Sequence, residues 1–118
     1  MRLTQIVPVL FSLSLAIAGY GQEINMTTTK SSAERNMADS LLEKQQYKQA
    51  LPIYSRLLKQ YPRDPQIQSN IGICYLYGTR RMDLAVTFLS QASTGDVSSK
   101  VYFYLAEALR QSYRFSEA

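Results

Sequence analysis

Apolar residues between positions 47 and 61 recur at intervals of three and four, and this spacing strongly constrains the fold. An α-helix brings residues three and four apart onto one face, so the spacing predicts an amphipathic helix. A shorter stripe of the same kind lies just upstream, and only residues 44–46 separate the two. We therefore expect a tight turn between antiparallel helices. The two stripes consist of Met37, Ala38, Leu41 and Leu42, then Tyr47, Ala50, Leu51, Tyr54, Leu57, Leu58 and Tyr61.

This helical hairpin recurs along the chain. One constant shift leads from Ala38 to Gly72 and then to Ala106. In the second helix of the hairpin the shift is longer by a single position, and we expect the additional residue in the turn at 78–83. The residues related by this longer shift are Ala50, Tyr54 and Leu57 in the first copy and Ala85, Leu89 and Ala92 in the second. A constant period of this length indicates a stacked array of hairpins.

The period and its marker residues resemble the tetratricopeptide repeat. Glu34 and Gln68 depart from the family pattern, because Trp is common at their positions. The resemblance covers residues 31–118 and implies an all-α solenoid of about two and a half repeats. The first repeat would span 31–64, the second 65–98 and a partial third 99–118. The matching residues of the first copy are Met37, Ala38, Leu41, Tyr47, Ala50, Tyr54 and Pro62.

Capping residues predict the helix boundaries. Ser31 and Glu34 have the capping-box pattern, and Asp64-Pro65 reads as an N-cap followed by the first helical residue. Gly95 is expected to end a helix. Gly72 in mid-helix costs about 1 kcal/mol relative to Ala, so we expect a neighbouring helix to approach closely there. The predicted helices are about 31–45, 48–60, 65–77, 82–93 and 99–111.

Residues 1–21 have the pattern of a secretory signal peptide. Arg2 precedes an apolar run from about Ile6 to Ala18, which is shorter than the roughly 20 apolar residues that span a bilayer. Cleavage is expected after Ala18 or after Gly21, and an uncleaved anchor is the alternative. Residues 22–30 are polar, and we expect them to form a linker between the signal peptide and the repeats.

Composition argues against catalysis and against nucleic-acid binding. The chain has no His and a single Cys, Cys74, so it lacks the commonest catalytic base and the usual zinc clusters. Its 13 basic and 9 acidic residues are scattered, whereas a nucleic-acid binder of this size usually gathers its basic residues on one face. We expect no enzymatic activity, no cofactor, no metal site and no nucleic-acid partner. Cys74 should be a buried, unreactive thiol.

The resemblance also implies where a partner binds. In this repeat family the first helices of the hairpins line a concave groove that holds a peptide or a partner helix. Side chains beside the core stripe recur there at the repeat spacing. The alternative is that each of them belongs only to a solvated helix face. The predicted partner-binding groove consists of Arg35, Asn36, Asp39, Ser69, Asn70, Ile73, Leu76, Tyr77, Phe103, Glu107 and Arg110.

The repeats are further similar to the N-terminal repeats of exported Gram-negative envelope proteins that carry OmpA-like domains downstream. This resemblance implies a non-catalytic protein-binding scaffold in the periplasm or at the outer membrane. The alternative is a docking arm of a longer envelope protein whose wall-anchoring or catalytic domain follows residue 118. Residues 113–118 are expected to begin another helix after a turn, which leaves an apolar face of the 99–111 helix uncovered.

Overall fold

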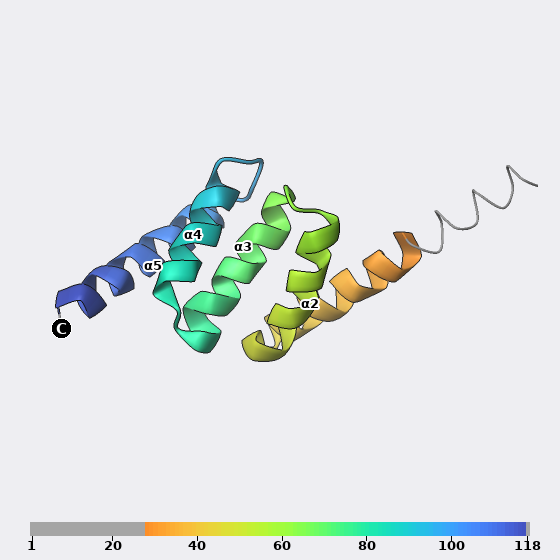
Figure 1. Ribbon diagram of the computed structural model, residues 1–118, viewed down its shortest axis with the longest axis horizontal. Coiled ribbons are helices and arrows are strands. Elements are labelled where there is room, and N and C mark those ends of the chain that lie inside the picture. Colours follow the sequence, from red (N-terminus) through yellow and green to blue (C-terminus); the bar gives the residue numbers. More distant parts are fainter. Residues whose placement is uncertain (1–27, 118) are drawn as a thin grey trace, which may run out of the picture. The chain divides into compact units, whose positions relative to one another are not determined.

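The computed structural model describes residues 28–117, and all regular structure within them is helical (Figure 1). The predicted all-α class is therefore confirmed for this part of the chain. The predicted signal peptide and most of the predicted linker lie outside the described residues. The chain divides into two units, residues 1–33 and 34–118. Of the first unit only the helical residues 28–33 are described, so the packing below concerns the second.

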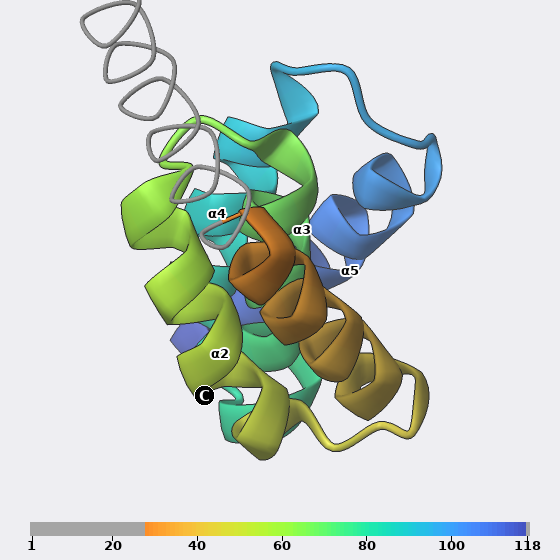
Figure 2. The ribbon, with the colours of Figure 1, turned by 90° about the vertical axis from the view of Figure 1, so that its right-hand side faces the viewer.

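The described chain is a succession of helical elements. Residues 28–43 are helical and precede α2 (Tyr47–Gln60), α3 (Pro65–Cys74), the π-helical segment η1 (Tyr75–Thr79), α4 (Met82–Ser93) and α5 (Lys100–Glu117). The labelled α-helices alternate in direction (Figure 1). Helix α3 packs between α2 and α4, and α4 packs between α3 and α5. Figure 2 shows α2 beside the gold helix that contains residues 34–43, where Leu41 and Leu42 join the core.

The chain is already helical at residue 28, which differs from the prediction. Ser31 and Glu34 therefore lie inside a helix, and the capping box expected there is wrong because the backbone N–H groups at this point are not at a helix start. The linker assignment is wrong for residues 28–30 for the same reason.

The end of the described chain also differs from the prediction. Helix α5 runs without interruption from Lys100 to Glu117, so the turn expected after residue 111 does not form. The segment 108–117 contains neither Gly nor Pro to stop a helix. Gly95 follows α4, but its φ is not positive. A Cβ at Gly95 would lie 2.8 Å from the Cβ of Pro65, so glycine serves close packing there rather than a left-handed turn.

A capping side chain marks the start of α3, and residues in the left-handed backbone conformation follow two of the helical segments. The Asp64 carboxylate accepts hydrogen bonds from the backbone N–H groups of Gln66 (2.9 Å) and Ile67 (3.3 Å), and the predicted N-cap of α3 is confirmed. Gln45 after the first helix and Arg80 after η1 both adopt a left-handed conformation, with φ values of 60° and 58°. This conformation turns the chain sharply at a helix end and is adopted most easily by glycine.

Two clusters of buried side chains form the core. One lies mainly between α2 and α3, where Tyr54 is fully buried and its hydroxyl donates a hydrogen bond to Asp39 at 2.5 Å. The other lies between α4 and α5 and includes Leu89 and Ala108. Beside this buried stripe α5 presents exposed apolar side chains, because Tyr102 is 55% exposed and Leu109 is 49% exposed. The uncovered face predicted for this helix is therefore confirmed.

Helices α3 and α4 approach each other closely at Gly72. A Cβ at this position would lie 2.6 Å from Cγ of Leu89 and 3.2 Å from its backbone nitrogen. Any side chain would therefore push α4 away from α3. The close approach predicted from a mid-helix glycine is confirmed.

Gly72→Ala should destabilise the protein by about 1–3 kcal/mol, because the added methyl overpacks the contact with Leu89. At an exposed helical position the same change would instead stabilise by about 1 kcal/mol. Urea unfolding of the purified proteins measures the difference. In a Leu89→Ala background the added methyl finds space, so the cost of Gly72→Ala should shrink there. An equal cost in both backgrounds would contradict the proposed contact.

Candidate partner-binding site

Four aromatic rings from three elements form a continuous row. The Tyr47 and Tyr77 ring centroids lie 5.7 Å apart, with the rings tilted by 34°. Tyr77 meets Tyr104 edge-on at 6.2 Å, and Tyr104 meets Phe103 edge-on at 5.6 Å. Tyr47 begins α2, Tyr77 lies in η1, and the other two belong to α5. We call these four residues the aromatic row.

The aromatic row is partly open to solvent. Phe103 is 65% exposed and Tyr77 is 40% exposed, while Tyr47 and Tyr104 are half-buried. Burial, together with the neighbouring Tyr104 phenol, raises the pKa of Tyr47 and of Tyr77 above the ordinary value. Both phenols are therefore protonated at neutral pH, and each offers an O–H donor beside its ring.

Local backbone structure holds the first two rings together. Gly78 follows Tyr77 within the π turn, and a Cβ at Gly78 would lie 2.8 Å from the Cβ of Tyr47. Only glycine lets η1 approach the start of α2 this closely. Single π turns of this kind occur frequently at functional sites in proteins.

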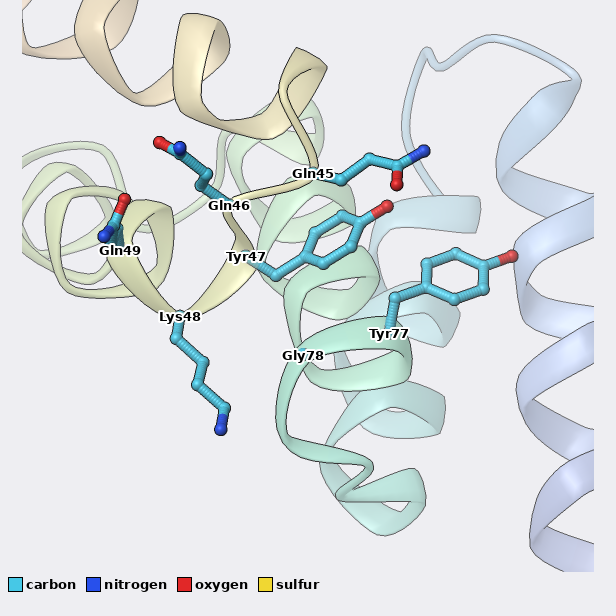
Figure 3. A pocket seen from close by; sticks show the side chains of 7 residues that line it. All are labelled: Gln45, Gln46, Tyr47, Lys48, Gln49, Tyr77 and Gly78. Atoms are coloured by element: carbon cyan, nitrogen blue, oxygen red, sulfur yellow. The ribbon is translucent and has the colours of Figure 1, made fainter.

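A pocket of about 310 Å³ lies at the α2 end of the aromatic row. Figure 3 shows the side chains of Gln45, Tyr47 and Tyr77 pointing to the same side, whereas Lys48 points away from the two rings. The lining residues carry one positive charge and no carboxylate. They are Gln45, Gln46, Tyr47, Lys48, Gln49, Tyr77 and Gly78.

The structure distributes the predicted groove residues over three environments. Tyr77 and Phe103 are in the aromatic row, and Arg110 and Asn36 are also exposed. Four residues are half-buried, namely Arg35, Asp39, Ile73 and Glu107. Three residues are buried, namely Ser69, Asn70 and Leu76. The buried three present almost no surface to a ligand, so their assignment to an open groove is wrong.

Several of the predicted polar residues instead stabilise the fold. Arg35 forms an ion pair with Asp64 at 2.9 Å and lies 5.9 Å from the centre of the Tyr61 ring. Burial opposes ionisation of Asp64, but the hydrogen bonds from Arg35 and from a backbone N–H hold its pKa below the usual value. Asn70 accepts a hydrogen bond from Gln66 at 3.2 Å. These side chains are occupied within the fold.

Glu107 and Arg110 form a charged pair next to the aromatic row. Two guanidinium nitrogens of Arg110 donate to the Glu107 carboxylate, at 2.5 and 3.1 Å, and Gln111 donates a third bond at 2.7 Å. The hydrogen bonds from Arg110 and Gln111 lower the pKa of Glu107. Its negative charge also contributes, after burial and the Tyr104 phenol, to the raised pKa of Tyr77.

Sequence reasoning missed Tyr47 and Tyr104. Tyr47 was assigned to the core stripe of its helix, and Tyr104 belongs to none of the rows that recur at the repeat spacing. Tyr47, Tyr77 and Tyr104 are unequally spaced along the sequence, so no repeat register links them. Only the contacts of the η1 ring with a ring of α2 and a ring of α5 bring the three together.

A second hollow of about 540 Å³ lies where the start of α3 meets the end of α4. None of its lining residues is aromatic. They are Arg63, Pro65, Gln68, Ser90, Gln91, Thr94 and Gly95. Because aromatic anchors usually dominate the energy of a protein interface, the aromatic row is the stronger candidate for partner binding.

Residues 28–117 contain no cluster of three or more His, Cys, Asp or Glu that would suit a metal ion. No helix in this range has the length and the apolar character of a membrane span. A scan against protein-family models and searches of curated proteins and of solved structures found no match to the chain.

Cys74 is fully buried, and burial raises the pKa of its thiol from 9.0 to about 12. The thiol therefore stays protonated in the folded protein at pH 8 to 9, where an exposed thiol reacts readily. The predicted burial of Cys74 is confirmed, and its lack of reactivity remains a prediction.

The raised pKa of Cys74 predicts a pH dependence of stability. Its contribution is fully present below pH 9 and is lost as the pH rises toward 12, because only the unfolded thiol ionises in that window. The wild type should lose about 1.4 kcal/mol more than Cys74→Ala between pH 7 and pH 10. Urea unfolding at both pH values measures this, and the Ala variant corrects for the tyrosines. An identical pH dependence of the two proteins would show that the thiol is not buried.

Proposed function

We propose that this protein is a non-catalytic protein-binding module of the bacterial cell envelope and that it holds a segment of its partner on the aromatic row. The observation that carries the proposal is the row itself, in which three elements contribute contacting and partly exposed rings. Aromatic side chains combine a large apolar area with few rotatable bonds, and they are enriched at protein interfaces. A few such anchors usually supply most of the binding energy.

Residues separated by about one predicted repeat length lie in similar environments, and this similarity supports a tetratricopeptide-like fold. Three pairs of residues with the same separation are all fully buried: Ala50 and Ala85, Tyr54 and Leu89, Leu57 and Ala92. The left-handed residues Gln45 and Arg80 also have this separation. Ala38 and Gly72 are also both buried, but their separation along the sequence is shorter by one residue. The additional residue thus falls between Gly72 and Arg80, where the π turn of η1 accommodates one more residue than an α-helix.

The envelope location is supported by the signal-peptide pattern of residues 1–21 and by the resemblance to exported repeat proteins. We propose that the protein is exported and is either soluble in the periplasm or peripherally attached to the outer membrane.

Export predicts a processed N-terminus. N-terminal sequencing of the protein from fractionated cells should give a chain that begins at Gly19 or Gln22, because signal peptidase cleaves after small residues. Intact Met1 in the inner-membrane fraction would instead indicate an uncleaved anchor.

Substitutions in the aromatic row should separate binding from folding. Tyr77→Ala and Phe103→Ala should each weaken partner capture by at least about 1 kcal/mol, because each removes an anchoring ring. Their melting temperatures should stay close to that of the wild type. Quantitative capture from envelope extract, with the partner identified by mass spectrometry, provides the measurement.

Arg56→Ala and Lys59→Ala are matched controls for this experiment, because both residues are exposed on α2 and neither belongs to the aromatic row. Capture by these variants should equal that of the wild type. If they lose capture while the ring variants retain it, the binding surface lies on α2 instead.

A further inference from the structure

Exposed apolar side chains are concentrated on α5. Among the described residues, four of the seven large apolar side chains that are exposed belong to this helix: Tyr102, Phe103, Leu109 and Tyr113. Without Phe103 but with the exposed Ala106, they follow one another in steps of four, three and four residues. Such steps place residues on one face of a helix. We call Tyr102, Ala106, Leu109 and Tyr113 the α5 stripe.

The α5 stripe lies outside the core of the protein. Helix α5 packs on α4 through the buried Val101 and Ala108, and each stripe residue follows or precedes a residue of that packed face. Figure 1 shows α5 as the outermost helix of residues 34–117, with α4 on one side and no other described helix on the other. A contiguous exposed apolar surface marks an interaction site more often than a scattered one does.

One member of the stripe is held in position before any partner binds. The Tyr102 hydroxyl donates a hydrogen bond to the backbone carbonyl of Ser93 at the end of α4, at 3.1 Å. This bond fixes the ring while leaving it 55% exposed. An ordered side chain loses less conformational freedom when it enters an interface.

The α5 stripe is self-complementary. Read in reverse, it has the same spacing and again a tyrosine at each end. A second copy of α5 that runs antiparallel therefore places Tyr113 opposite Tyr102 and Leu109 opposite Ala106, and the two-fold axis repeats both contacts. Alternating steps of four and three are also the spacing of the a and d positions of coiled coils. Each central layer combines a large and a small side chain, which lets the two helices interdigitate.

A parallel pair of the same helices fits less well. It would place each residue opposite its own counterpart, so that Ala106 meets Ala106 and leaves a gap between the helices. It would also bring the like ends of the two helix dipoles side by side. The antiparallel arrangement avoids both costs.

The charges beside the stripe are compatible with an antiparallel pair. Arg110 and Glu107 form an ion pair within α5, so their charges are balanced before any contact is made. Given the pairing above, Arg110 of one copy lies near Phe103 of the other. Phe103 is 65% exposed, and a guanidinium is attracted to the face of an aromatic ring. The two-fold axis repeats this contact as well.

We infer that this protein forms a weak homodimer in which the α5 stripes of two copies pack in antiparallel orientation. The stripe contains few residues, and interfaces of the smaller size class bind weakly. We expect a dissociation constant of about 10 to 100 μM. The inference goes beyond the proposed function, because Tyr47 and Tyr77 of the aromatic row come from α2 and η1 and take no part in the pairing.

Sedimentation equilibrium of the full-length protein, as isolated from cells, tests the inference. The average mass should rise from that of one chain at about 1 μM to that of two chains at about 1 mM. Leu109→Glu should weaken association at least about tenfold, because it places a carboxylate in both central layers. Met37→Glu is the matched control, because Met37 is an exposed apolar residue of the first helix, and it should associate like the wild type.

A mixture of two variants tests the orientation of the helices. Ala106→Lys should also weaken association when this variant is studied alone. In the antiparallel pair, residue 109 of one copy meets residue 106 of the other. An equimolar mixture of Leu109→Glu and Ala106→Lys should therefore form a heterodimer at a concentration at which each variant alone is monomeric. A parallel pair would not bring the two substitutions together, and mixing would not repair a folding defect.

The inference is overturned if the protein remains monomeric up to about 1 mM, if Leu109→Glu associates like the wild type, or if the mixture does not recover association. A monomer would leave the α5 stripe to a helix of a different protein. Tyr77→Ala separates the inference from the proposed function, because this variant should lose capture from envelope extract and still dimerise. Loss of dimerisation in Tyr77→Ala would place the contact between copies on the aromatic row and contradict the pairing of the stripes.

Discussion

The close packing of α4 on α3 at Gly72 is the contact on which the rest of the structure depends. The Leu89 side chain occupies the space that a side chain at Gly72 would need, and the Tyr75 and Phe88 rings stack beside this contact at 5.8 Å. Because η1 continues from α3 and α5 packs on α4, the separation of α3 and α4 also sets the distance between Tyr77 and Tyr104. The positions of surface side chains that come from different helices are therefore set by how those helices pack in the core.

The aromatic row lies where the backbone is least regular. Gln45 and Arg80 are the non-glycine residues with positive φ in the described chain, and η1 is a π turn that ends next to Arg80. Strained backbone of this kind costs about 1–3 kcal/mol per residue and persists where surrounding packing enforces it. Here the approach of Gly78 to Tyr47 supplies that packing. The irregularity and the exposed rings therefore have a common origin in the hairpin turn.

Some polar residues in the first helix of each hairpin make contacts inside the fold, whereas others are exposed to solvent. Asp39 accepts the hydroxyl proton of the buried Tyr54 in a hydrogen bond, and the Asn70 side chain is buried. Leaving such buried groups without partners would cost about 1–3 kcal/mol each, so these side chains satisfy the interior. The surface that remains for a partner is consequently more aromatic and less charged than the spacing of the sequence suggested.

The sequence by itself determined part of the local structure. Apolar spacing correctly predicted helices near α2, α3 and α4, Asp64-Pro65 predicted a helix start, and Gly72 predicted a close contact. Each of these depends on residues within a few turns of helix. Tertiary structure alone decided that Asn70 and Leu76 are buried, that η1 is a π turn, and which rings meet. Tyr47, Tyr77 and Tyr104 share no periodicity, and their contact arises because helices far apart in the sequence pack at one fixed separation, which no local pattern encodes.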